Sequence, residues 1–321
     1  MPLPDLTKKY AFEEATVVLF NPVSQMRSTL RDAVLVQGFR NILDYSDLQR
    51  TRQAIIESSP DLIMLDLDRE KEEVCNLVRE IRHSSISDDP FAVIIALSWH
   101  PSIEAVNNSL EAGVDDIVMM PVSIKLLSDR IDILIRNRKE FVVTASYVGP
   151  DRRSAEDTRK DPIGLGTIKV PNNLRFKATG DVAAAASESI VSNVKAKINN
   201  HRLNRYAQRI AWLIDETLRL KATSMEVPTA SEKRLDEVAS LVDSLALELE
   251  SLSQIELLEI CDSMVRVIEN IRSTPTKQFY ELLKIHAFAV TATLMETEGA
   301  ADLLIAALND ARSRLDRARS A

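Results

Sequence analysis

The chain has 321 residues, which is long for a single hydrophobic core and favours two domains. Its 45% hydrophobic and 27% charged residues are typical of folded globular chains and exclude a wholly disordered one. With only seven glycines, a loop-rich all-β fold is not expected and helix should dominate. The net charge of −8 argues against nucleic acid as a partner, because phosphate contacts need clustered lysine and arginine.

The cysteines and the apolar runs bear on the compartment. Cys75 and Cys261 are too few for a disulfide framework and fit reduced thiols. No apolar run approaches the roughly 20 residues that span a bilayer, and residues 1–14 lack the apolar segment of a secretory signal. We therefore expect a cytoplasmic protein that does not contact a membrane, with residues 1–14 as an N-terminal extension.

Residues 15–140 alternate between apolar runs of strand length and amphipathic stretches of helix length. Several runs are continuously apolar, as in strands that are covered on both faces. Alternating β and α units of this length predict a doubly wound parallel sheet of the flavodoxin-like class. The expected strands are 16–20, 39–45, 61–67, 91–97 and 113–120, and the expected helices are 23–38, 46–59, 69–84, 101–113 and 123–139.

The remainder of the chain divides into a linker and a helical domain. Residues 141–181 contain four of the seven glycines and no helical period, so they read as a linker. Residues 182–321 predict an all-α helical bundle, because helices joined by short turns pack antiparallel. Two apolar seams with 3-4 spacing run along its first two helices, at Leu203–Leu220 and Leu235–Leu252. The expected helices are 182–223, 228–251, 253–273, 275–297 and 299–319.

Polar side chains stand where the predicted strands end. Asp66 closes the third strand, Ser98 the fourth, and Met120 precedes Pro121 at the end of the fifth. Functional residues of open α/β sheets lie at these carboxyl ends. Over residues 16–138 this pattern resembles the receiver domain of bacterial response regulators. The resemblance implies that Asp66 matches the phosphoacceptor and Ser98 the hydroxyl residue that contacts the phosphoryl group.

The sequence departs from the receiver pattern at several positions. Asn21 and Pro22 stand where the family has two acids that help hold Mg²⁺, and Asp68 restores only part of that negative charge. Met120 replaces the lysine that pairs with the phosphoryl oxygens, and Ile117 replaces the switch aromatic. Arg69–Val74 replace the usual Pro- and Gly-containing loop. Asp66 could instead cap the next helix, and Ser98 could satisfy strand-end backbone groups.

Three functions remain open at this point. The first is a two-component (phosphorelay) signalling protein without enzymatic activity, whose receiver-like domain is a regulatory binding module on a helical interaction domain. The second is a phosphorylation-competent response regulator that uses Asp66, with Mg²⁺ as its cofactor. The third is a phosphatase in the helical half, for which Glu216 and Asn204 are conceivable but not selected by any motif.

The partners follow from the same resemblance. A protein partner is expected, such as a histidine kinase or a phosphotransfer protein, and the seams suggest a homodimer through the helical domain. His201 and His286 lie in helical stretches that do not resemble phosphotransfer sequences, so they read as ordinary helical histidines. The four histidines and two cysteines lack the close spacing of a zinc site, so no metal ligands are expected.

Overall fold

The computed structural model describes residues 10–99, 102–144, 147–152, 166–222 and 228–294. The chain divides into two compact units, Met1–Ile198 and Asn199–Ala321. The boundary falls within one long helix, α7 (Glu188–Ala222). No helix in the described part of the chain is long and apolar enough to cross a membrane.

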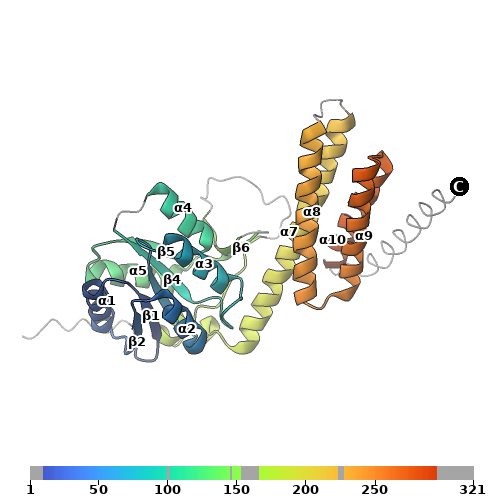
Figure 1. The fold of residues 1–321 in the computed structure, drawn as a ribbon. Helices are drawn as coiled ribbons and strands as arrows, with labels where there is room; N and C mark the ends of the chain where they lie inside the picture. Colours follow the sequence, from blue (N-terminus) through green and yellow to red (C-terminus); the bar gives the residue numbers. More distant parts are fainter. Residues whose placement is uncertain (1–9, 100–101, 145–146, 153–165, 223–227, 295–321) are drawn as a thin grey trace, which may run out of the picture. The chain divides into compact units, whose positions relative to one another are not determined.

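The first unit contains a parallel sheet of five strands in the order β2-β1-β3-β4-β5 (Figure 1). This is the flavodoxin-like strand order, so it confirms the fold class predicted from the sequence. The strands are β1 (Thr16–Phe20), β2 (Asn41–Tyr45), β3 (Leu62–Asp66), β4 (Val93–Ser98) and β5 (Asp116–Met119). The helices are α1 (Ser24–Gln37), α2 (Leu48–Ser58), α3 (Lys71–Arg82), α4 (Ile103–Ala112) and α5 (Ile124–Asn137).

Side chains of the central strands alternate between two hydrophobic cores, one on each face of the sheet. Val17 and Leu19 of β1 face the core that α1 and α5 cover, while Val18 and Phe20 face the core that α2 and α3 cover. Because both faces are buried, these strands read as continuous apolar runs in the sequence. The burial also fixes the register that brings the strand ends together.

The segment after α5 differs from the expected linker, because much of it is ordered and packs on the sheet unit. It contains β6 (Phe141–Val143), β7 (Val148–Pro150), α6 (Asn173–Thr179) and the 3₁₀ turn η1 (Val182–Ala184). β6 and β7 form an antiparallel pair. The predicted helix 182–223 accordingly begins later, at Glu188.

A buried ion cluster fastens this segment to the sheet. Asp115 accepts a hydrogen bond of 2.8 Å from the Arg82 guanidinium and one of 2.8 Å from the Arg138 guanidinium. Both guanidiniums lie 5.2 Å from the centre of the Phe141 ring in β6. A Cβ atom on Gly113 would lie 2.8 Å from the Val148 carbonyl oxygen, so β7 approaches too closely for a side chain there. These contacts join residues that lie far apart in the sequence. Composition within the segment therefore does not reveal them and suggests a flexible connector.

The start of α7 packs on the same segment. Val191, Val194 and Ile198 are buried in a small core with Phe91 and Phe141. From the sequence we expect the stretch around Ile190–Ile198 to stay uncovered and to favour a partner chain. That expectation is wrong for these three side chains, which β6 and its neighbours cover within one chain, whereas Ile190 is 38% exposed.

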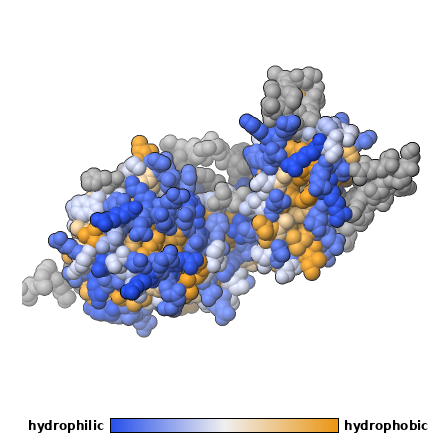
Figure 2. Space-filling view, in the orientation of Figure 1, coloured by the Kyte–Doolittle hydropathy of each residue, from blue (hydrophilic) through white to orange (hydrophobic). Residues whose placement is uncertain are grey.

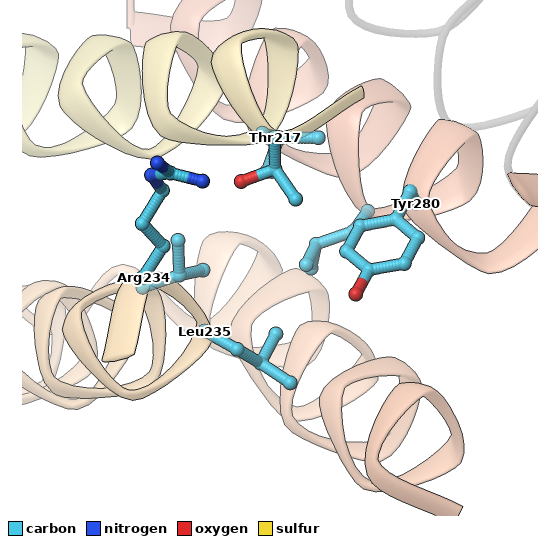
Figure 3. Close-up of a pocket in the computed structure, with 7 residues that line it drawn as sticks. Thr217, Arg234, Leu235 and Tyr280 are labelled. Carbon is cyan, nitrogen blue, oxygen red and sulfur yellow. The ribbon is translucent and has the colours of Figure 1, made fainter. Parts of the chain in front are cut away.

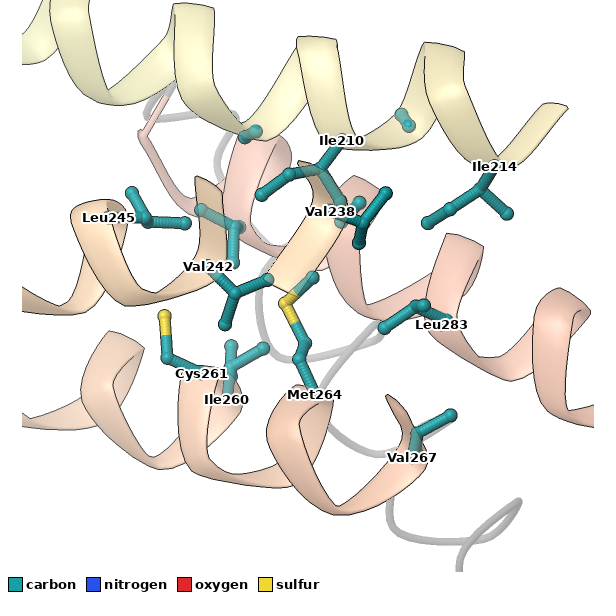
Figure 4. Close-up of a cluster of buried hydrophobic side chains, with 14 of the residues drawn as sticks. Ile210, Ile214, Val238, Val242, Leu245, Ile260, Cys261, Met264, Val267 and Leu283 are labelled. Carbon is teal, nitrogen blue, oxygen red and sulfur yellow. The ribbon is translucent and has the colours of Figure 1, made fainter. Parts of the chain in front are cut away.

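The described part of the second unit consists of the rest of α7 with α8 (Pro228–Ser251), α9 (Ile255–Ser273) and α10 (Lys277–Leu294). Its core lies between these helices, where Ile210 and Ile214 of α7 face Val238 and Val242 of α8 (Figure 4). Most of the residues of the two predicted seams belong to this core, so the seams hold one chain together. The predicted fifth helix, 299–319, lies outside the described residues.

Candidate functional site

Four neighbouring strand ends converge at the carboxyl edge of the sheet. Asp66 and Ser98 are the last residues of β3 and β4, while Asn21 and Met120 directly follow β1 and β5. The strands lie in the order β1-β3-β4-β5, so the sheet brings the four residues together as the sequence predicts. All four are buried.

The Asp66 carboxylate is held by neutral donors. One oxygen accepts a 2.8 Å hydrogen bond from the Asn21 side-chain amide, and the other accepts a 3.0 Å bond from the Asp68 backbone N–H. Asp66 does not cap α3, whose N-cap residue Glu70 makes no side-chain cap bond. Burial raises the pKa of Asp66 above its ordinary value, and the Asp68 charge raises it further, while the Asp68 N–H, Arg69 and Asn21 lower it.

The Asp68 side chain accepts hydrogen bonds from two donors at the end of β4. Its carboxylate accepts a 2.6 Å hydrogen bond from the Ser98 hydroxyl and a 2.9 Å bond from the Trp99 backbone N–H. Ser98 therefore donates to Asp68 and makes no described bond to Asp66, while its backbone carbonyl accepts the Met120 N–H at 2.8 Å. The carboxylate of Asp68 thus meets the hydroxyl that the receiver resemblance assigns to a phosphoryl group.

The β5 side of the site is apolar. Met120 is 6% exposed and packs in the core beneath α1 and α5. Ile117 is partly buried against the core on the opposite face. Neither side chain can donate a hydrogen bond or carry a positive charge towards Asp66.

The sequence does not single out two groups that shape this site. Arg27 of α1 donates to the Asn21 backbone carbonyl at 2.9 Å and to the Asp44 carboxylate at 3.2 Å, which fixes the loop after β1. The Asn21 side-chain oxygen accepts the Val23 N–H at 2.9 Å, so its amide nitrogen is left to face Asp66. The donor at Trp99 is its backbone N–H, and the residue type at that position does not predict it. For Arg27, the only indication in the sequence is its position six residues after Asn21.

The helical unit does not bring the conceivable phosphatase residues together. Glu216 and Asn204 both lie in α7, and twelve residues of α-helix separate them by roughly 18 Å. Glu216 pairs with Arg219, and Asn204 donates to the Asn200 carbonyl at 3.0 Å. A cavity lined by Thr217, Arg234, Leu235 and Tyr280 among others measures about 10 Å³, which is room for a single water molecule (Figure 3).

The two histidines of the helical unit, His201 and His286, lie in ordinary helical surroundings. His286 is buried in α10, where its two ring nitrogens lie 2.7 Å from the Leu282 carbonyl and 2.9 Å from the Ser263 hydroxyl. His201 lies in α7 and is partly buried. Among the described residues, no three His, Cys, Asp or Glu side chains gather as a metal site would require.

Comparison with protein-family models gives no match, and comparison with curated proteins gives none either. Several solved structures that are similar to part of the chain are chemotaxis or response-regulator proteins. Vibrio cholerae chemotaxis protein CheY4 is 16% identical with a TM-score of 0.33, and 37% of this chain covers 96% of it. A Thermotoga maritima response regulator is 23% identical with a TM-score of 0.33, for 37% of this chain and 94% of that one. A Clostridium difficile two-component response regulator is 16% identical with a TM-score of 0.34, for 39% and 98%.

Proposed function

We propose that this chain is a signal-transduction protein of the two-component type whose receiver-like domain works as a regulatory binding module and not as a phosphoryl acceptor. It has no enzymatic activity in this account. The helical unit is its interaction domain. The partner is a protein, and a histidine kinase or a phosphotransfer protein is the first candidate, in keeping with the receiver resemblance.

The observation that carries the proposal is the contact between Asp68 and Ser98. A phosphoryl group on Asp66 would need donors, and the Ser98 hydroxyl and the Trp99 N–H already donate to the Asp68 carboxylate at 2.6 and 2.9 Å. The carboxylate of Asp68 thus occupies the position at these donors that a phosphoryl group would need. The domain would hold one conformation of the β4 end whether or not a phosphodonor is present.

The charges around Asp66 favour the same account. Phosphoryl transfer depends on positive charge that neutralises the oxygens of the transferred group. Met120 supplies none, and the described ion pairs do not include Asp66. Asp68 lies beside Asp66, so a phosphodonor would meet two carboxylates and the Asn21 amide, with the exposed Arg69 as the one cation that acts on Asp66 among the described residues.

Magnesium, the cofactor of the receiver family, does not fit the donors of this site. Mg²⁺ takes oxygen ligands in a near-octahedral shell, usually with carboxylates among them. Each oxygen of Asp66 and of Asp68 accepts one hydrogen bond from the chain, so Mg²⁺ would have to share these oxygens with their donors. The amide of Asn21 points its nitrogen, which is not a ligand for Mg²⁺, at Asp66. Pro22 offers no side-chain ligand. The function proposed for this domain therefore does not require a bound metal ion.

A magnesium titration of the full chain tests the proposal. Asn21→Asp keeps the shape of the side chain and replaces the donor 2.8 Å from Asp66 by a second carboxylate. Wild type is expected to show no saturable Mg²⁺ response in NMR spectra or calorimetry, and the variant is expected to gain one that Asp66→Ala removes. Wild-type Mg²⁺ binding as tight as that of Asn21→Asp would overturn the proposal and favour the phosphorylation-competent alternative.

Self-association through the helical unit stays a prediction. The seams are buried inside one chain, but several large apolar side chains of this unit are exposed, and Figure 2 shows apolar patches on its visible face. They include Trp212 on α7, Leu247 on α8 and Phe288 on α10. Sedimentation of the full chain at tens of micromolar decides the matter, since a monomer there contradicts the dimer.

A further inference from the structure

A polar cavity of about 340 Å³ lies in the first unit, away from the Asp66 site. Its size is within the range of sites that hold small molecules, which begins near 300 Å³. The end of α5, the residues just after it, the strip before α6 and the turn η1 form its wall. We call it the Lys139–Lys169 cavity; it is lined by Ile135, Arg136, Asn137, Arg138, Lys139, Glu140, Lys169, Val170, Asn172, Arg175, Asp181, Ala183 and Ala184.

The lining is basic although the chain is acidic. Five of the lining residues are arginine or lysine and two are acidic, a formal net charge of +3, whereas the whole chain carries −8. Basic side chains that converge from separate segments on a concave surface favour an anion. The cavity also has few apolar walls, so an uncharged apolar ligand is disfavoured.

Two of the five cations are available to a ligand. Arg138 is committed to Asp115, Arg136 to Asp132 and Arg175 to Asp181, at 2.8, 3.0 and 2.8 Å. Lys139 and Lys169 are exposed, and no ion pair or hydrogen bond of their ammonium groups is described. A lysine ammonium is a point charge that suits phosphate oxygens.

Both acidic residues of the lining have partners within the chain, and the charge of Asp181 is matched by a cation. Glu140 accepts a hydrogen bond from the Thr167 hydroxyl, and Asp181 pairs with Arg175. At the end of α5, the Leu134 carbonyl accepts from the Asn172 amide at 2.9 Å and the Arg136 carbonyl from Arg175 at 3.4 Å. The negative end of the α5 dipole is thereby capped.

We propose that the Lys139–Lys169 cavity binds a small phosphate-bearing anion through the ammonium groups of Lys139 and Lys169. The ligand is held by charge and by the shape of the cavity and undergoes no reaction there. This inference does not depend on the proposed function of the Asp66 site. Because the cavity is formed by the segment that joins the sheet to α7, its occupant would contact that segment directly.

Calorimetry with inorganic pyrophosphate tests the inference on the full chain, at constant ionic strength and without divalent cations. Wild type is expected to bind one pyrophosphate, and Lys139→Ala with Lys169→Ala is expected to weaken binding by about tenfold for each lysine removed. Lys71→Ala with Lys125→Ala is the matched control, since it removes two exposed lysines that do not line the cavity. That control is expected to bind like wild type.

Two results would overturn the inference. One is the absence of saturable binding to wild type, and the other is an equal loss of affinity in the cavity variant and the control, which would mean that general surface charge attracts the anion. Amide NMR shifts identify where pyrophosphate binds. Pyrophosphate is expected to move the signals of Lys139, Lys169 and Arg175, and not those of the residues around Asp66. The four lysines are exposed, so circular dichroism is expected to show that both variants keep their fold.

Discussion

The Ser98 hydroxyl lies 2.6 Å from the Asp68 carboxylate, to which it donates a hydrogen bond. Ser98 is 1% exposed, so its hydroxyl has little access to water and depends on this acceptor. Asp68 in turn holds the first amide after β4, that of Trp99. A single carboxylate therefore satisfies the two donors at the end of β4.

Removal of that carboxylate should loosen the end of β4. Asp68→Ala leaves the Ser98 hydroxyl and the Trp99 N–H without their acceptor, which is expected to cost about 1–3 kcal/mol of unfolding free energy. Hydrogen–deuterium exchange of the Trp99 amide is the direct readout, and its protection should fall. Asp129→Ala, which breaks an exposed pair with Lys125, is the control and should change neither quantity noticeably. Unchanged protection of Trp99 in Asp68→Ala would contradict the contact.

Two aspartates of the sheet unit should titrate in opposite directions. Burial raises the pKa of Asp66 above 3.8. Burial acts on Asp115 in the same sense, but the charges and hydrogen bonds of Arg138 and Arg82 and the Ile94 N–H leave its pKa lowered. Carbon-13 NMR of the two carboxyl groups, followed against pH, measures both midpoints. An Asp66 midpoint below that of Asp115 would contradict the account.

These shifts have consequences of opposite sign for stability. The folded chain holds the Asp66 proton more tightly than the unfolded chain does, so this group costs stability as the pH rises from about 3.8 through its raised folded pKa. Asp115 contributes stability above 3.8, and that contribution is lost as the pH falls from there through its lowered folded pKa.

The ion cluster should be a principal source of stability for the segment after α5. Asp115→Asn leaves the buried Arg82 and Arg138 guanidiniums without a counter-charge, which is expected to cost about 3–5 kcal/mol. Burial already lowers the pKa of Arg82 to about 10. Asp116→Asn is the control, because its pair with Arg130 is at 3.4 Å and partly exposed and contributes roughly 0–1 kcal/mol.

Tryptophan fluorescence can follow that loss within the first unit. The chain has two tryptophans, Trp99 in the sheet unit and Trp212 in the helical unit, so Trp212→Phe leaves one reporter for the sheet unit. Urea unfolding in this background compares Asp115→Asn with Asp116→Asn. Equal midpoints for the two variants would show that the cluster adds no more than a surface pair.

The core of the helical unit offers a pair of neighbouring leucines for a matched test. Leu245 of α8 is fully buried, whereas Leu247 on the same helix is 68% exposed. Leu245→Asp places an unpaired charge in the core and is expected to unfold the helical unit, while Leu247→Asp should change its stability by less than about 0.5 kcal/mol. Trp212 fluorescence in a Trp99→Phe background measures both, and a folded Leu245→Asp unit would refute the packing described for α8.

The parts that the sequence predicted well depend on local patterns. The strands of the sheet are continuous apolar runs, and their order places Asp66, Ser98 and Asn21 at one edge whatever the loops do. The sequence does not predict the ordered segment after α5, because the partners of Arg138 and Phe141, which are Asp115 and Arg82, lie far away in the sequence. The hydrophobic periodicity of the segment does not predict contacts with distant residues.

The sequence also does not predict the hydrogen bond between Ser98 and Asp68. The receiver resemblance puts Ser98 opposite Asp66, yet the loop after β3 turns the Asp68 carboxylate towards Ser98 instead. That choice depends on the backbone of a few loop residues and on the backbone N–H of Trp99. Residue types alone do not specify it.

The most direct test of the central claim is the intact mass of the wild-type chain after incubation with a small phosphodonor and Mg²⁺, beside Asp66→Ala. Wild type is expected to stay unmodified, because the donors at the end of β4 already bind Asp68 and Met120 supplies no positive charge. Rapid, Mg²⁺-dependent gain of one phosphoryl group by wild type, absent in Asp66→Ala, would contradict it.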